Sequence, residues 1–187
     1  PFIAHWPKVI KAGSRTDKLV CLTDIMATSA EIANADLPAS AAVDSISFLP
    51  TLQGKDNHAR KDVIHHSISG YFSIRQNNYK LALCPDSGGW TSPKPSSANW
   101  AKLKEAGEPL VQLYDMDKDL GEKNNLAATM PEKVQELRKL LEAQVANGRS
   151  NPGPKQSNDT AITIDKAPKS GGGKAKKTRK KGKNKKE

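Results

Sequence analysis

The residues with the clearest potential for metal chemistry lie in an acidic turn in the second half of the chain. Aspartate alternates with other residues at Asp115, Asp117 and Asp119, which is how a calcium-binding EF-hand loop begins. Such a loop also needs glycine at its sixth position and a bidentate glutamate at its twelfth. Those positions hold Leu120 and Leu126. We therefore predict no metal site in this chain and interpret the turn as a structural connection.

Two adjacent histidines, His65 and His66, are candidates for binding a ligand. On the strand predicted for residues 63–66, neighbouring side chains point to opposite faces. At most one of the two rings therefore faces a given pocket, and we expect this of His66 more than of His65. The alternative is a structural histidine that is hydrogen-bonded within the fold.

A long segment from residue 85 to residue 109 is rich in glycine and proline and contains Trp90 and Trp100. Loops of this length are uncommon unless they are functional or disordered. An exposed tryptophan here could stack on a sugar ring or an aryl group. The alternative is that both tryptophans pin the loop to the body of the protein.

The cysteine content is low, with only Cys21 and Cys84. Two cysteines are too few for a disulfide scaffold, and neither lies in a Cys-x-x-Cys or Cys/His cluster that would bind zinc. A bridge between them stays open, but the strand pairing below places Cys84 on a polar face, and we expect no bridge.

The N-terminal third predicts a strand, a helix and a turn-rich stretch. Residues 1–6 are apolar and end at Pro7, which predicts a strand. A helix is expected from Thr23 or Asp24, with Asn34 as a left-handed end. Its apolar face is expected to pack in the core; the face comprises Ile25, Met26, Ser29, Ile32 and Ala33. Residues 36–61 are turn-rich, with a short helical turn near residues 49–52.

A β-hairpin is predicted around Asn77-Asn78, two residues that tolerate positive φ and suit a type I′ turn. This turn pairs Gln76 with Tyr79, Ile74 with Leu81 and Phe72 with Leu83. One face then becomes apolar, and a slip of one residue would scramble it. Residues 63–66 and 111–114 are the expected partner strands.

The clearest helix is expected over residues 129–147. Thr129 and Glu132 have the spacing of a capping box, and Gly148 is expected to end the helix. The buried stripe comprises Val134, Leu137, Leu140, Leu141 and Val145. The fold class predicted from these elements is α+β, with a small antiparallel sheet of about four strands packed on the C-terminal helix.

The acidic turn also resembles the closing segment of the formylglycine-dependent, arylsulfatase-like sulfatases, which reads Leu-Tyr-Asp-Leu-x-x-Asp-Pro-x-Glu-x-x-Asn-Leu. The matching residues are Leu113, Tyr114, Asp115, Asp119, Glu122, Asn125 and Leu126, and Leu120 stands where proline is usual. Four further segments resemble the family in the same order: residues 1–7 with Gly13, 23–28, 44–52 and 74–81. Ser45 replaces the usual glycine in the third of them.

The resemblance implies the C-terminal portion of a sulfatase beside a large α/β domain of the alkaline-phosphatase type. It implies hydrolysis of aryl or carbohydrate sulfate esters, a formylglycine made from a Cys-x-Pro-x-Arg motif, a calcium ion, and a periplasmic or secreted location. Neither Cys21 nor Cys84 lies in that motif. We therefore expect the nucleophile and the calcium ligands outside this chain, and no catalytic residue and no activity in the chain alone. Within it, His66, His65 and Trp90 are the candidates for contacting the sulfated small molecule or glycan.

The net charge of +10 lies entirely in the C-terminal tail, because residues 166–187 contain 11 Lys or Arg against one acid. Such a tail is expected to be disordered and to bind polyanions without specificity, since it offers no aromatic residue for stacking. The alternative to an enzyme is therefore a protein that binds polyanions or nucleic acid through this tail.

The sequence predicts four segments. Residues 1–61 are the end of the α/β domain, and residues 62–149 form the sheet and the helix. Residues 150–165 are a linker, and residues 166–187 are the tail. No apolar run is long enough to span a membrane.

Overall fold

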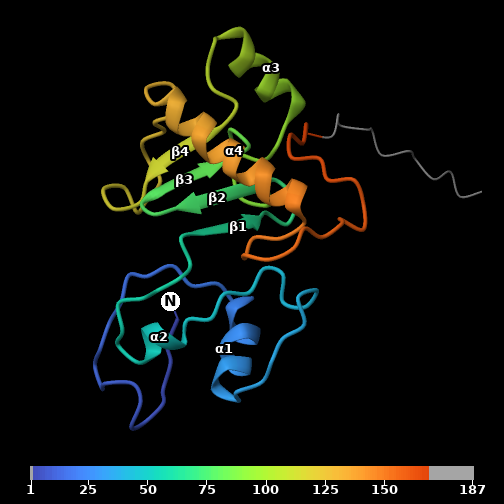
Figure 1. Ribbon diagram of the computed structural model, residues 1–187. Coiled ribbons are helices and arrows are strands. Elements are labelled where there is room, and N and C mark those ends of the chain that lie inside the picture. Colours follow the sequence, from blue (N-terminus) through green and yellow to red (C-terminus); the bar gives the residue numbers. More distant parts are fainter. Residues whose placement is uncertain (1, 169–187) are drawn as a thin grey trace, which may run out of the picture.

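The computed structural model describes residues 2–168, so most of the lysine-rich tail lies outside the described residues. A four-stranded sheet with a long helix across one face forms the larger part, and a smaller part holds two short helices (Figure 1). The helices are α1 (Asp24–Ile32), α2 (Leu49–Leu52), α3 (Ser97–Glu105) and α4 (Pro131–Asn147). The strands are β1 (Asp62–His66), β2 (Phe72–Gln76), β3 (Tyr79–Ala82) and β4 (Gln112–Asp115). The predicted α+β class and the four-stranded sheet are confirmed.

All neighbouring strands pair antiparallel in the order β1-β2-β3-β4. The predicted register is confirmed, with Gln76 opposite Tyr79 and Ile74 opposite Leu81. The predicted turn type is wrong, because only Asn77 of the two turn residues has positive φ, at 52°, whereas a type I′ turn needs both. Both expected partner strands are present.

The core lies between the sheet and α4 and contains apolar side chains from β2, β3, β4 and the helix. The fully buried members are Ile74, Leu81, Leu113, Leu137 and Leu141. Because Ile74, Leu81 and Leu113 follow one another across three paired strands, they present one continuous surface to the helix stripe. The predicted stripe of α4 is confirmed, with Val134, Leu140 and Val145 half-buried around it.

The predicted C-terminal end of α4 is confirmed, whereas the predicted N-terminal end is wrong. Gly148 ends the helix in the left-handed conformation, with φ of 63°, as expected of a glycine after a helix. The capping box is wrong, because α4 begins at Pro131 and the hydroxyl of Thr129 donates instead to the carbonyl of Leu126 at 3.1 Å. Proline fixes φ at a value suited to the first helical position, which moves the start two residues along.

In the N-terminal part, the predicted strand at the start of the chain and the predicted buried face of the first helix are both wrong. Residues 2–6 form no strand, because no neighbouring strand supplies their backbone hydrogen bonds. Helix α1 buries Asp24 and Thr28 rather than its apolar stripe, and Ile25, Met26 and Ile32 are about half exposed. The predicted left-handed end at Asn34, with φ of 51°, and the helical turn at α2 are both present.

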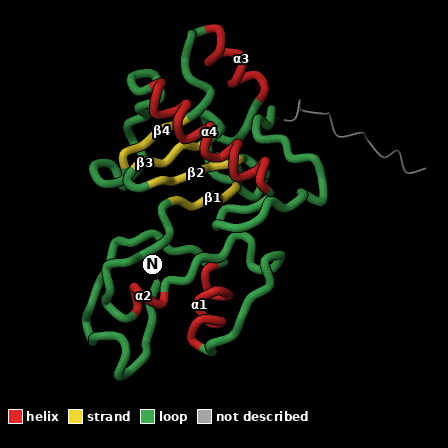
Figure 2. The backbone as a smooth tube through the Cα atoms, in the orientation of Figure 1, coloured by secondary structure: helices red, strands yellow, loops and turns green. Residues whose placement is uncertain are grey.

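The long loop contains a helix that the sequence analysis missed. Ser96 accepts a hydrogen bond from the amide of Asn99 at 3.4 Å and caps α3, and Gly107 follows the helix with φ of 72°. A serine before an alanine- and lysine-containing stretch that ends in glycine is the signal that could have found it. Figure 2 shows α3 as a separate short helix beyond the sheet.

Residues 150–166 contain no helix or strand but contact both parts of the molecule. The side-chain amide of Asn151 donates to the carbonyls of Ala42 and Ser45 at 2.8 and 3.0 Å, and Ile164 packs against the core. The predicted boundaries of linker and tail stay predictions. None of the helices within residues 2–168 has the length and apolar character needed to cross a membrane.

Candidate functional site

The acidic turn after β4 closes onto the strand through Asn125. The side-chain oxygen of Asn125 accepts from the amides of Leu113 and Ala127 at 2.9 and 3.0 Å, and its amide group donates to the carbonyl of Val111 at 3.0 Å. The amide of Leu126 then donates to the carbonyl of Leu113 at 2.8 Å. This one side chain therefore occupies backbone groups that an edge strand would otherwise leave unpaired.

Two carboxylates of the turn, those of Asp115 and Asp119, are engaged by donors of the chain. Asp119 accepts from the amides of Asn124 and Lys123 at 2.7 and 2.8 Å, and these hydrogen bonds lower its pKa. Asp115 has a lowered pKa mainly because Asn78 donates to it. Hydrogen bonds of this kind stabilise the ionised form of an aspartate, so the turn has the structural role that the sequence predicts.

A buried ion pair holds the smaller part together. Asp24 is fully buried and receives Arg60 through two hydrogen bonds, one of them 2.7 Å long from Nε. The same carboxylate accepts from the backbone amides of Cys21 at 2.9 Å and Ile46 at 3.0 Å. Arg60 also donates to the carbonyl of Asp44 at 2.7 Å. The pair therefore joins the start of α1, the segment around residue 45 and the entry to β1.

A second set of hydrogen bonds locks α1 onto residues 45–48. The hydroxyl of Thr28 donates to the carbonyl of Asp24 at 2.7 Å and accepts from the amide of Phe48 at 3.1 Å. The hydroxyl of Ser45 accepts from the amide of Ala27 at 2.8 Å. Two of the segments that resemble sulfatases, 23–28 and 44–52, thus contact each other directly, and the matching residues Asp24 and Thr28 have a structural role.

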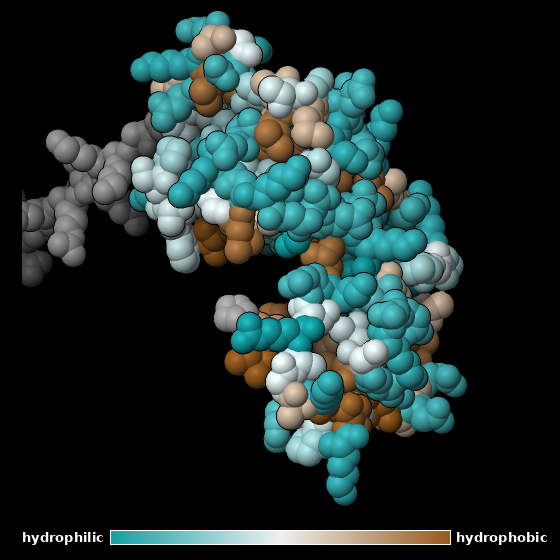
Figure 3. Space-filling view, turned by 90° about the vertical axis from the view of Figure 1, so that its left-hand side faces the viewer, coloured by the Kyte–Doolittle hydropathy of each residue, from teal (hydrophilic) through white to brown (hydrophobic). Residues whose placement is uncertain are grey.

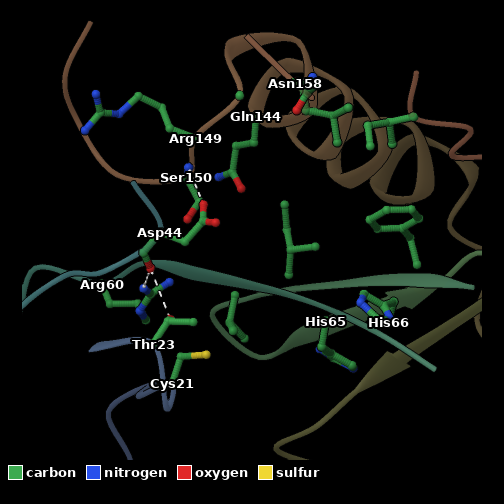
Figure 4. Close-up of a pocket in the computed structure, with 16 residues that line it drawn as sticks. Cys21, Thr23, Asp44, Arg60, His65, His66, Gln144, Arg149, Ser150 and Asn158 are labelled. Atoms are coloured by element: carbon green, nitrogen blue, oxygen red, sulfur yellow. Dashed lines mark hydrogen bonds between the residues drawn. The ribbon is translucent and has the colours of Figure 1, made fainter. Parts of the chain in front are cut away.

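A cleft of about 290 Å³ lies between β1, the C-terminal end of α4 and the segment that follows it. His65 and His66 both line the cleft, together with Arg60 and Gln144 (Figure 4). In Figure 4 the side chain of Arg149 points away from the histidines. The apolar side chains that line the cleft are those of Val63, Ile64, Phe72, Val145 and Ile162. The structure therefore brings two of the three predicted site residues together, and the expectation that only one of the two histidines would face a given pocket is wrong.

The two histidines differ in their surroundings. Nδ1 of His66 lies 3.0 Å from the carbonyl oxygen of Ser67; since a carbonyl only accepts, Nδ1 carries the hydrogen, and Nε2 of the neutral ring is an acceptor. The pKa of His65 is lowered, first by loss of hydration and then by the charge of Lys80. The lowered pKa favours the uncharged form of His65, and Nε2 of His66 is available to accept a hydrogen bond when that ring is neutral.

Trp90 does not line the cleft. It is 76% exposed, so the alternative that both tryptophans pin the loop to the body is wrong for this residue. Trp100 does anchor the loop, because its Nε1 donates to Asp86 at 2.6 Å and its ring lies 5.8 Å from that of Tyr71.

Three positions were missed or misjudged from sequence. Arg60 and Arg149 are buried arginines, and no motif at either position signalled this. Cys84 was expected on a polar face, but it is only 4% exposed because the loop that follows β3 covers it. Both cysteines are free thiols.

The described residues do not fit the calcium site of the resemblance. Within residues 2–168 no group of three or more His, Cys, Asp or Glu side chains could hold a metal ion. The ammonium of Lys80 on β3 pairs with Glu122 at 2.6 Å. The cleft offers hydrogen-bonding and apolar groups for a ligand.

Comparison with known proteins adds an independent line of support. No family model matches the chain. The chain is 34% identical over 143 residues to the N-acetylgalactosamine-6-O-sulfatase of Bacteroides thetaiotaomicron, covering 76% of this chain and 26% of the relative. It is 33% identical over 145 residues to an ulvan-active sulfatase of Formosa agariphila, covering 68% and 28%.

A solved structure in complex with its substrate, D-glucosamine-2-N,6-O-disulfate, shares the fold. It is 25% identical to this chain, covers 75% of it and 27% of its own length, and has a TM-score of 0.52. The chain thus spans about a quarter of the length of the proteins that it matches. With the segment order and the strand register described above, these similarities show that the chain belongs to the sulfatase family, as a C-terminal portion of its fold.

Proposed function

We propose that this protein hydrolyses sulfate esters of a carbohydrate and that the present chain supplies part of the surface that binds the substrate. The observation that carries the proposal is the 34% identity to an N-acetylgalactosamine-6-O-sulfatase over 76% of the chain. An aryl sulfate is the second substrate class, since arylsulfatase A of Homo sapiens is 30% identical over 156 residues.

The cleft beside β1 is the proposed place of contact. The Nε2 atom of His66 accepts a hydrogen bond from a sugar hydroxyl, and when its ring is protonated the same atom donates to a sulfate oxygen. The apolar wall of the cleft excludes water from one side of the ligand. Such a mostly apolar pocket with a few polar groups is typical of sites for small ligands.

The reacting groups belong to residues outside this chain. Sulfatases use a formylglycine and a calcium ion, and neither cysteine here lies in the motif that is converted. We therefore assign the chain a role in binding and orientation, and we expect no turnover by the chain alone. A secreted or periplasmic location fits a carbohydrate sulfatase and is part of the proposal.

The experiment is a sulfate-release assay on 6-O-sulfated N-acetylgalactosamine and on an aryl sulfate. It compares the longest natural form of the protein that contains this chain with the chain alone. We expect turnover only by the longer form, and His66→Ala in that form should raise KM more than it lowers kcat. Turnover by the isolated chain, or none by the longer form on any sulfate ester, would contradict the proposal.

The alternative of a binding protein without enzymatic activity receives no support from the relatives, which are named sulfatases. The tail, whose sequence suggested that alternative, lies mostly outside the described residues. Its proposed role is to keep the enzyme near a polyanionic substrate through charge. Deletion of residues 166–187 should weaken retention on a sulfated polymer at low salt, and unchanged retention would exclude this role.

A further inference from the structure

The turn that carries Trp90 is closed by its own hydrogen bonds. The amide of Ser87 donates to the carbonyl of Pro93 at 3.0 Å, and its hydroxyl donates to the carbonyl of Thr91 at 2.7 Å. Trp90 is 76% exposed, although tryptophan is highly buried on average. The turn is therefore held without using the indole ring, which leaves the ring free to contact a ligand.

The base of this turn is fixed to the body. The carboxylate of Asp86 accepts from the amide of Gly88 at 2.8 Å and from Nε1 of Trp100 at 2.6 Å. The side chain of Gln112 on β4 donates to the carbonyls of Cys84 and Asp86 at 2.7 and 2.9 Å. A fixed base means that little conformational entropy is lost when a ligand binds to the turn.

The loop lies directly against the turn between β1 and β2. A Cβ atom added to Gly89 would be 3.3 Å from Cγ2 of Ile68, and one added to Gly88 would be 3.3 Å from the side chain of Ser67. The glycines therefore permit this close approach. Ile68 is 65% exposed, so two exposed apolar side chains, Ile68 and Trp90, lie on contacting segments.

A lysine lies beside the same turn. Nζ of Lys166 donates to the carbonyl of Ser69 and lies 5.7 Å from the centre of the Tyr71 ring. The adjacent carboxylate, Asp165, is engaged by Arg138 through two hydrogen bonds of 2.8 Å. Within residues 2–168, Lys166 forms no ion pair. An ammonium has three donors, so two remain for an anion.

We propose that Trp90, Ile68 and Lys166, together the Trp90 platform, bind a sugar unit of a sulfated glycan. The apolar face of a sugar ring stacks on the indole and on Ile68, and a sulfate group pairs with the ammonium of Lys166. None of the three residues lines the cleft that holds His65 and His66. The choice of a sulfated glycan as ligand rests on the proposed function.

The test titrates the full 187-residue chain with a 6-O-sulfated galactosaminoglycan oligosaccharide and with its desulfated counterpart, at one fixed salt concentration. Calorimetry gives the affinity. Trp90→Ala should weaken binding of both ligands about tenfold. Lys166→Gln should weaken binding of the sulfated ligand about threefold and leave the desulfated ligand unchanged, as for an exposed ion pair. All variants carry the same lysine-rich tail, so the tail does not account for the differences.

Matched controls are Leu120→Ala, another exposed apolar residue, and Lys155→Gln, an exposed lysine in the same C-terminal segment. Both should bind like the unchanged chain, and circular dichroism should show the same helix content in all variants. The proposal is overturned if the unchanged chain does not bind, if Trp90→Ala binds normally, or if single-stranded DNA binds more tightly than the sulfated ligand through Trp90. Because binding needs no catalysis, a failed sulfate-release assay leaves this result independent.

Discussion

Replacing Asp24 by asparagine is expected to release α1 from the segments that it joins. The carboxylate accepts four hydrogen bonds, two from Arg60 and one each from the amides of Cys21 and Ile46. Asparagine has the same shape but only one acceptor oxygen. Its amide group would face two donors, and the buried charge of Arg60 would lose its partner.

The magnitude follows from burial. The side chain of Asp24 is 1% exposed and that of Arg60 is 3% exposed, so solvent cannot replace the lost partner. Removing one member of such a buried pair costs about 3–5 kcal/mol. Since about 1.4 kcal/mol corresponds to a factor of ten, amides protected by this unit should exchange roughly 100- to 5,000-fold faster.

The assay is hydrogen exchange with mass spectrometry on peptides that contain the amides of Cys21 and Ile46. The control is Asp165→Asn, which also removes a two-bond partner of an arginine, but at a side chain that is 69% exposed. That change should cost about 0–1 kcal/mol and should not alter exchange at residues 21 and 46. If Asp24→Asn accelerates exchange less than threefold at both amides, the buried pair does not hold this part together.

Three further outcomes are expected. Asn125→Ala removes three hydrogen bonds and should lower the free energy of unfolding by about 2 kcal/mol in urea titrations. The control, Asn124→Ala, should change the free energy of unfolding little. Equal effects of the two changes would refute the structural role of the turn. The pKa of His65 is lowered by loss of hydration and by the charge of Lys80. Its contribution to stability is therefore complete above the unfolded pKa and declines as pH falls through the folded pKa. Nuclear magnetic resonance should show the ring titrating below the usual value for histidine, and a higher value would contradict this. Burial raises the pKa of Cys84 to about 11, so its thiol should resist alkylation at pH 8 until denaturant is added; fast alkylation of the native chain would disprove the burial.

Sequence reasoning succeeded where alternation or helical spacing was carried by apolar residues with partners in the same chain. The hairpin register could be predicted because a shift of one residue would expose Ile74 and Leu81. The stripe of α4 could be predicted because it faces those same residues. The turn at Asn125 was recognised through its resemblance to the closing segment of the sulfatases, whereas the backbone contacts of its side chain were not predicted.

The errors have physical causes. The apolar stripe of α1 has helical spacing, yet the buried side of the helix is polar because Asp24 and Thr28 make hydrogen bonds there. Periodicity alone does not identify which face a polar network will bury. Arg60 could not be found from sequence, since its partner is 36 residues away and no local pattern signals a buried guanidinium.

The N-terminal part also has several exposed apolar side chains. Figure 3 shows a hollow between the two parts of the molecule, with hydrophobic side chains on the lower part. The exposed apolar residues of that part are Phe2, Ile3, Leu22, Ile25, Met26, Ile32 and Leu37. Large exposed apolar patches mark surfaces that bind other protein segments. The sulfatase relatives offer such segments, since they are about four times as long as the stretch that this chain matches.

The closure of β4 by Asn125 has a consequence for how the protein associates. An unpaired strand edge is a template on which another chain can add a strand, and such addition leads to swapped dimers or fibrils. Here the outer side of β4 already has its hydrogen bonds, while β1 lies at the opposite end of the sheet order. Strand addition at the β4 edge is therefore blocked, and β1 is the other edge of this sheet in the described residues.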